Sequence, residues 1–221
     1  IIHPDRREVL PLMPEPITRQ DGDTKNDCER NAAKRFLARL KQDYPGVVFT
    51  ITEDALSPNA PHIEELHKHG YHYILGVKPG DHEFLFEQVA LARQEGRTTE
   101  FEQQEGGALH RFSFINQMPL NKSNPDILVN FIEYWEIKKN KTQHFCWVTD
   151  FVVTKLNVFT IMRGGRARWK VENETFNTLK NQGYHFDHNF GHGDNHLSVV
   201  FATLMMLAFL VDQVQQLACA L

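Results

Sequence analysis

Two acidic residues, Asp54 and Glu172, stand in the sequence where carboxylates could hold a metal ion. Asp54 follows the apolar run 47–52, at the carboxyl end of an expected strand, where open α/β sheets form ligand sites. Glu172 lies in an expected helix over residues 166–182. At about 100° per residue it falls in the middle of the apolar face. Because Mg²⁺ and Mn²⁺ prefer carboxylate oxygens, the two residues predict a divalent-metal site.

Each of these residues also has a simpler explanation. Arg168 precedes Glu172 by one helical turn and could neutralise it in an ordinary buried ion pair. Asp54 could merely start a turn. The residues alone leave both alternatives open, although strand alternation points Glu53 to the other face and disfavours it as a ligand.

A histidine-rich segment is the main competing signal. His185, His188, His192 and His196 lie within twelve residues, beside Asp187 and Asp194, and histidine is a common zinc ligand. The spacing matches no known zinc motif, and the glycines around His192 indicate a tight loop. Loop packing is therefore favoured over a zinc site.

The elements that must position these residues change character along the chain. Strands at 47–52 and 71–77 alternate with helices at 25–43, 60–68 and 81–94, which predicts parallel strands with crossover helices. A Pro-broken run at 8–17 is expected to form a strand near a sheet edge. Four segments then alternate polar and apolar residues, at 98–102, 108–115, 127–137 and 143–149, which predicts an antiparallel β region. Helices follow at 157–163 and 166–182, joined at Gly164-Gly165, and a buried apolar helix ends the chain at 195–217.

The composition excludes several classes of protein. With 221 residues, 41% hydrophobic, the chain is globular, and its net charge of -4 excludes a basic field over the whole molecule. Cys28, Cys146 and Cys219 are too scattered for a disulfide framework or a Cys-based zinc site, which favours a reducing cytoplasm. We see no signal peptide, and the apolar stretch 197–211 falls short of the roughly 20 residues that a membrane span needs.

Several motifs together resemble a known family. The run Arg168-Trp169-Lys170-Val171-Glu172, followed by Phe176, Leu179 and Lys180, resembles the Tyr-Arg-Glu-Lys signature of insertion-sequence DDE transposases. Residues 25–35, 52–56 and 189–193 are also similar to this family, in the same order, so the resemblance covers nearly the whole chain.

The resemblance implies a fold and an activity. The fold is α/β, a ribonuclease-H-like mixed sheet with flanking helices and an inserted antiparallel β region before the catalytic helix. Residues 1–96 would form the core, 97–150 the β insertion and 151–221 the C-terminal helical part of the core. The activity would be DNA transposition, by metal-dependent strand cleavage and strand transfer with two Mg²⁺ or Mn²⁺ ions. DNA would be the partner of a homodimer in the cytoplasm, at the nucleoid and away from any membrane.

The resemblance also assigns residues. Asp54 becomes the second catalytic aspartate and Glu172 the catalytic glutamate, both as metal ligands, while Arg168 and Lys180 contact DNA phosphates. Between residues 163 and 181 five basic residues face two acidic ones, so Arg166 and Lys170 are further expected DNA contacts. Two departures stand out: Gly165 occupies the position of the signature tyrosine, and Lys180 lies one residue farther from Glu172 than the signature has it.

The family's first aspartate has no counterpart among these residues. Asp5, Asp21 and Asp23 are expected in turns, and Asp150 follows Asp54 in the wrong order. We therefore expect a C-terminal fragment that is catalytically inactive by itself. The alternatives are a non-enzymatic transposase remnant, a zinc-binding interaction module built on residues 185–196, and a nuclease that cuts strands without joining them.

Overall fold

The computed structural model describes residues 1–17, 22–139, 141–191, 193 and 196–219. The chain forms two compact units, which are described separately. The sheet unit is Leu37–Gly165, and the terminal unit joins Ile1–Phe36 to Arg166–Leu221.

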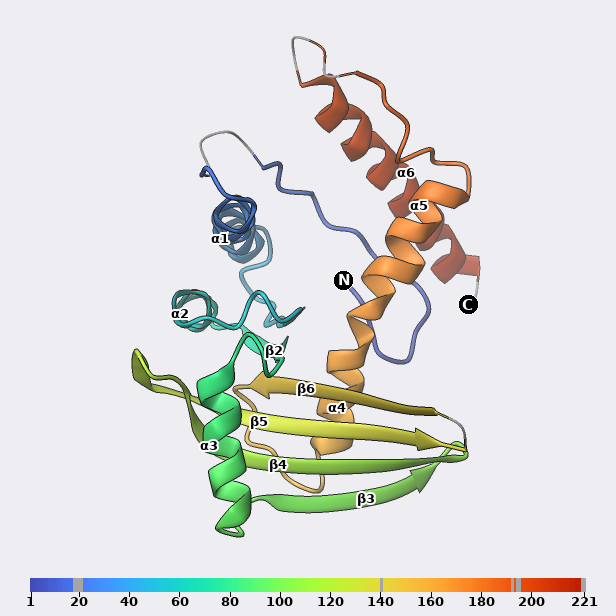
Figure 1. Cartoon of the computed structure of the whole chain (residues 1–221). Coiled ribbons are helices and arrows are strands. Elements are labelled where there is room, and N and C mark those ends of the chain that lie inside the picture. Colours follow the sequence, from blue (N-terminus) through green and yellow to red (C-terminus); the bar gives the residue numbers. More distant parts are fainter. Residues whose placement is uncertain (18–21, 140, 192, 194–195, 220–221) are drawn as a thin grey trace. The chain divides into compact units, whose positions relative to one another are not determined.

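One mixed sheet of six strands organises the sheet unit (Figure 1). Its strands are β1 (Thr50–Glu53), β2 (His72–Gly76), β3 (Thr99–Glu105), β4 (Ala108–Asn121), β5 (Asn124–Lys138) and β6 (Lys141–Thr149), in the order β1-β2-β6-β5-β4-β3. β1 and β2 are parallel, and β3 to β6 form an antiparallel meander that joins β2 through β6. The predicted change from parallel to antiparallel strands is confirmed, and both kinds of strand share one sheet.

Two helices cover opposite faces of this sheet. Helix α4 (Val158–Ala167) packs Val158, Ile161 and Met162 on aromatic residues of one face, among them Tyr134 and Trp147. Helix α3 (Glu83–Gln94) lies on the other face, where Phe86 meets Phe131 edge to face with ring centroids 5.4 Å apart. Because successive side chains of a strand point to opposite faces of the sheet, the residues that contact α3 alternate with those that contact α4.

Turn chemistry sets the bounds of the shorter elements. The helix predicted at 60–68 is α2 (Ala60–His69), which begins where Asn59 accepts the His62 N–H and ends at Gly70 in the left-handed region. The helix predicted at 81–94 begins later than expected, because α3 begins after His82 and has no side-chain cap. Helix α1 (Lys25–Asp43) has the predicted bounds.

The glycine pair in α4 does not form a joint. Gly164 and Gly165 lie inside the helix, and the predicted break between 163 and 166 is wrong. A Cβ at Gly165 would lie 2.7 Å from Trp147 Nε1 and 3.1 Å from Ile74 Cγ2. These glycines let the helix backbone approach the sheet closely.

The strand before Asp54 is shorter and more exposed than expected. The apolar run 47–52 predicted a buried strand, but β1 covers Thr50–Glu53 and Val48 is 61% exposed. β1 lies at the end of the strand order and pairs with β2 alone, which explains why the preceding apolar residues are not covered.

The terminal unit combines an extended segment with helices. Residues 8–17 form no strand, contrary to the prediction, and an Ile2–Val9 bridge is the described pairing in this segment. After α4 the chain continues as a π-helix (Val171–Phe176), α5 (Asn177–Asn181) and α6 (Leu197–Cys219), so the helix predicted at 166–182 is not a regular α-helix.

Helix α6 is less buried than expected. Phe209 and Gln213 are its buried residues, although we predicted a buried helix. It has 23 residues and contains an 18-residue window with a mean hydropathy of 2.0, so it is long and apolar enough to cross a membrane by length and composition alone. The sequence estimate of this stretch was too short, because it stopped at Asp212, which the helix includes.

Candidate active site

Asp54 stands at the carboxyl end of β1, where the sequence placed it. Its side chain is exposed, and its Oδ1 accepts the backbone N–H of Leu56 at 3.1 Å. The backbone N–H of Ser57 donates to the Asp54 carbonyl at 3.2 Å. A tight turn therefore fixes the backbone while the carboxylate faces solvent.

Glu53 is committed elsewhere. Its Oε2 lies 2.6 Å from Nε2 of His62, whose side chain is buried in α2. Sequence reasoning missed this pair, but it agrees with the expectation that Glu53 points away from the Asp54 side. The pair fastens the end of β1 to α2 and so positions the next residue.

Asp150 lies at the opposite end of the sheet from Asp54. Its carboxylate contacts Nδ1 of His72 at 2.5 Å and accepts the N–H of Tyr73 at 3.0 Å. Glu53 pairs with Leu75, so Asp54 lies level with Gly76, and Thr149 pairs with Ile74, so Asp150 lies level with Tyr73. The two aspartates are therefore separated by three residues of β2, about 10 Å at ~3.3 Å per residue. Asp150 is a structural residue that ties β6 to the start of β2.

Glu172 lies on the π-helix, where the N–H of Asn177 donates to its carbonyl five residues back. Arg168 Nη1 donates to Glu172 Oε1 at 2.9 Å, so the simple ion pair considered from the sequence is present. The predicted burial is wrong: the Glu172 side chain is 53% exposed, and Trp169 is 52% exposed. The wide turn rotates the helix, and Thr175 and Leu179 occupy the buried side instead.

A π-helical turn also lies on the way from Glu172 to Lys180. Because such a turn holds one residue more than an α-helical turn, it shifts the register of Lys180 by one residue. Lys180 thereby stands where a residue seven positions on would stand in a regular helix, nearly two turns away at about 3.6 residues per turn. Both side chains are exposed.

The ammonium of Lys170 is directed at the N-terminal segment. Its Nζ donates to the carbonyl oxygens of His3 at 2.6 Å, Pro4 at 3.0 Å and Arg6. Desolvation lowers the pKa of Lys170, against the opposing effect of Glu174 and Glu8. Since an ammonium has three donors, these contacts favour a structural role over the predicted DNA contact.

The histidine segment gathers no metal site among the described residues. His185 and His196 adopt left-handed backbone conformations, with φ of 56° and 57°, and His188 packs its ring 4.5 Å from that of Phe190. His192 and Asp194 lie outside the described residues. Within the described part, His185, His188 and His196 belong to no group of three metal-ligating side chains.

The family is decided by the range of the match. A family model described as Transposase DDE domain matches residues 12–210. The chain belongs to the DDE transposase family. A comparison with curated proteins finds no match.

Membership in the DDE transposases gives the site its setting. These enzymes act in DNA transposition, their activity is nucleotidyl transfer and DNA cleavage, and they generally use divalent metals. The six-stranded mixed sheet with flanking helices is consistent with a ribonuclease-H-like transposase fold. The predicted fold class is confirmed.

The donor set at Asp54 and Glu172 suits hard divalent ions, because both residues offer exposed carboxylate oxygens. Asp54 belongs to the sheet unit and Glu172 to the terminal unit, so their convergence stays a prediction. Asp5 lies in a turn and Asp23 in a bend, as expected, while Asp21 lies outside the described residues.

Proposed function

We propose that Asp54 and Glu172 bind the Mg²⁺ or Mn²⁺ ions with which this DDE transposase cleaves DNA strands and transfers them. One observation supports the proposal: both carboxylates are exposed, Asp54 at the carboxyl end of β1 and Glu172 on the π-helix. Arg168, which pairs with Glu172 at 2.9 Å, places a phosphate-binding cation beside this carboxylate.

The same segment supports membership of the Tyr-Arg-Glu-Lys group. The spacing from Arg168 to Glu172 matches the signature, and the π-helix compensates for the extra residue before Lys180. Gly165 occupies the position of the signature tyrosine. A Cβ there would clash with the Trp147 indole, which gives a physical reason for the missing aromatic residue.

The proposed roles follow from exposure and contacts. When bound, two divalent ions would lower the pKa of the attacking water or 3′-hydroxyl and stabilise the leaving oxygen. Asp54 offers a carboxylate whose backbone is fixed by its turn, and Glu172 offers one that Arg168 already orients. The Arg168 guanidinium has five N–H donors, so it can keep Glu172 and still reach a phosphate.

DNA contact is assigned to Arg168, Lys180 and Arg166, and Lys170 is reassigned to holding the N-terminal segment. We further propose that the transposase acts as a homodimer on transposon ends and target at the nucleoid. The 221-residue chain is expected to bind metal and DNA without cutting, because Asp54 and Glu172 supply two of the three carboxylates in this chemistry.

A titration of the 221-residue chain with Mn²⁺ tests the proposal. Binding is measured as the loss of the electron paramagnetic resonance signal of the free ion. Asp54→Asn and Glu172→Gln should each weaken binding by about tenfold or more, since a lost carboxylate costs at least what a lost outer-shell partner costs. Glu174→Gln is the matched control, because Glu174 lies two positions from Glu172, on a different side of the helix, where it pairs with Arg7 at 3.5 Å. Unchanged Mn²⁺ affinity in both test variants would overturn the assignment.

A further inference from the structure

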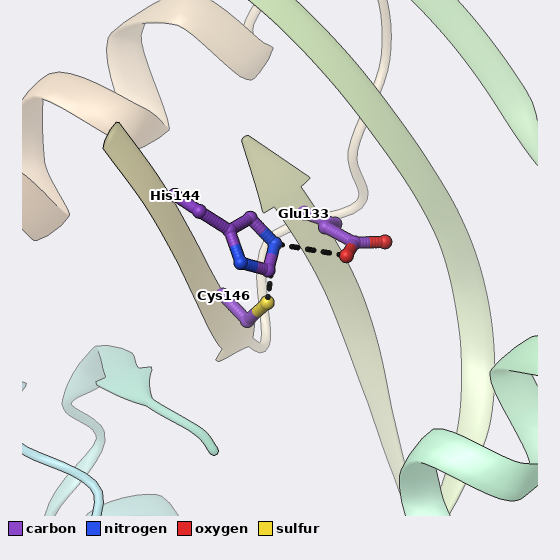
Figure 2. Close-up of side chains that lie close together, drawn as sticks. All are labelled: Glu133, His144 and Cys146. Atoms are coloured by element: carbon purple, nitrogen blue, oxygen red, sulfur yellow. Dashed lines mark hydrogen bonds and ion pairs between the residues drawn. The ribbon is translucent and has the colours of Figure 1, made fainter. Parts of the chain in front are cut away.

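A second group of potential metal ligands lies in the sheet unit, away from Asp54. Glu133 on β5 stands directly opposite Cys146 on β6, and His144 lies two residues before Cys146 on the same face (Figure 2). One ligand atom from each side chain lies within 4.8 Å of the other two. The three types of ligand, sulfur, nitrogen and oxygen, are those that proteins use for zinc.

The contacts converge on a single nitrogen. His144 Nε2 lies 2.9 Å from Glu133 Oε1 and 3.5 Å from Cys146 Sγ. A neutral ring nitrogen carries one hydrogen or one lone pair, so it cannot donate to the carboxylate and accept from the thiol at once. Hydrogen bonding thus satisfies one of the two contacts, whereas a cation at the centre would satisfy all three atoms.

The same convergence argues against a cysteine nucleophile. In a nucleophile–base–acid arrangement, the histidine uses one ring nitrogen for the nucleophile and the other for the acid. Here Glu133 and Cys146 both approach Nε2. Burial, and secondarily the Glu133 carboxylate, raise the pKa of the Cys146 thiol.

We propose that Glu133, His144 and Cys146 bind one transition-metal ion of the zinc type, with a fourth position open to water. At bond lengths of about 2.0–2.3 Å, tetrahedral ligand atoms lie roughly 3.3–3.6 Å apart. The His144–Cys146 distance of 3.5 Å fits this value, and the His144–Glu133 distance of 2.9 Å needs a small opening. On binding, the thiol proton leaves to solvent and the sulfur ligates as thiolate.

Neighbouring side chains already orient two of the ligands. Arg93, at the end of α3, donates to the second carboxylate oxygen of Glu133 and to Ser113 Oγ. The Trp135 ring stacks on His144 with centroids 5.0 Å apart. Such outer contacts hold metal ligands in place. Since thiolate and imidazole favour zinc-type ions over Mg²⁺, this site is independent of the proposed catalytic site.

Cobalt(II) titration of the chelator-stripped, 221-residue chain tests the site, because a cobalt–thiolate bond has a charge-transfer absorption. We expect one Co²⁺ per chain with this absorption, displaced by Zn²⁺ and unaffected by Mg²⁺. Cys146→Ser should remove the absorption. His144→Asn should weaken binding by at least the ~10–100-fold that a lost outer-shell partner costs, and its 44% exposed side chain makes the change tolerable for folding.

Matched controls separate this site from other thiols and from the catalytic carboxylates. Cys28→Ser and Cys219→Ser should keep the absorption, as should Asp54→Asn and Glu172→Gln. The proposal would be overturned if the chain is folded, as judged by circular dichroism, and yet shows no charge-transfer absorption at stoichiometric Co²⁺. So would an absorption that survives Cys146→Ser.

Discussion

Neighbouring basic residues on one helical segment differ in their contacts. The ammonium of Lys170 donates to three backbone carbonyls, whereas the side chain of Lys180 is exposed to solvent. Arg168 is held by Glu172. Charge alone therefore does not identify the DNA contacts, and the partner of each side chain must be known.

Lys170→Met should destabilise the chain without a direct effect on phosphate contact. The change removes three donors and leaves the carbonyls of His3, Pro4 and Arg6 to water. Because these groups are exposed, the expected loss is about 1 kcal/mol of unfolding free energy, below the roughly 1.5–3 kcal/mol typical of a hydrogen bond from a charged group. Urea denaturation measures it.

Lys180→Met is the control for Lys170→Met. It should leave the denaturation midpoint unchanged, lower the affinity for oligonucleotides and reduce the salt slope of binding by about 1. The reverse result, a stable Lys170→Met chain with weakened DNA binding, would return Lys170 to the DNA contacts.

Sequence reasoning located Asp54 at the residue scale because the end of a strand can be read from local pattern. It misjudged the burial of Glu172, because a regular helical period was assumed and a π-helical turn leaves no clear sign in the residues. It also excluded a cysteine-based metal site from cysteine spacing. His144 and Cys146 lie two apart on one strand, but the pairing that adds Glu133 is known only from the register.

At the scale of elements, the contact of α4 with the sheet depends on absent side chains. A Cβ at Gly165 would meet Trp147 Nε1 at 2.7 Å and Cε2 at 2.8 Å, and neither indole atom is a flexible end. At Gly164 a Cβ would meet the Ile74 Cδ1 methyl at 2.8 Å, which is the far end of its side chain. The two glycines should therefore respond differently to alanine.

Gly165→Ala is expected to lower the unfolding free energy and Gly164→Ala to change it little. Overpacking costs about 1–3 kcal/mol, and the higher helix propensity of alanine returns roughly 1 kcal/mol. At Gly165 the clash exceeds this gain, whereas at Gly164 the methyl can turn aside. Thermal unfolding of the two variants and the parent chain measures the order, and equal Tm values for the two variants would contradict it.

Element positions were largely predictable, because caps and strand alternation are local signals. Asn59, Gly70 and the alternating strands gave α2 and the antiparallel meander. Packing was not predictable. The residues before β1 are exposed because β1 lies at the end of the strand order, and Gly164-Gly165 serve a close approach that the sequence presented as a break.

For the whole molecule, the family match gives the apolar helix its context. Most of α6 falls within the matched residues 12–210, so it belongs to the transposase domain. We propose that its exposed apolar residues serve packing in the working transposase and not insertion into a membrane. The net charge of -4 provides no basic field over the whole molecule, so the proposed DNA contacts depend on local groups such as Arg168 and Lys180.

The convergence of Asp54 and Glu172 is the prediction on which the catalytic site depends. Two ions about 3.5–4 Å apart, with bonds of ~2.1 Å, require both carboxylates at one place. Fe²⁺ bound in place of Mg²⁺ generates hydroxyl radicals that cut the nearby backbone. The 221-residue chain with Fe²⁺, ascorbate and peroxide should be cut near residue 54 and near residue 172.

Competition and substitution identify the source of these cuts. Excess Mg²⁺ should suppress both of them together, and so should Asp54→Asn alone, since the pair of ions that the two carboxylates share produces both cuts. Cuts between residues 133 and 146 would come from the Glu133, His144 and Cys146 group, and Zn²⁺ rather than Mg²⁺ should suppress them. If Asp54→Asn removes the cut near residue 54 and leaves the cut near residue 172, the two carboxylates bind separate ions and share no catalytic site.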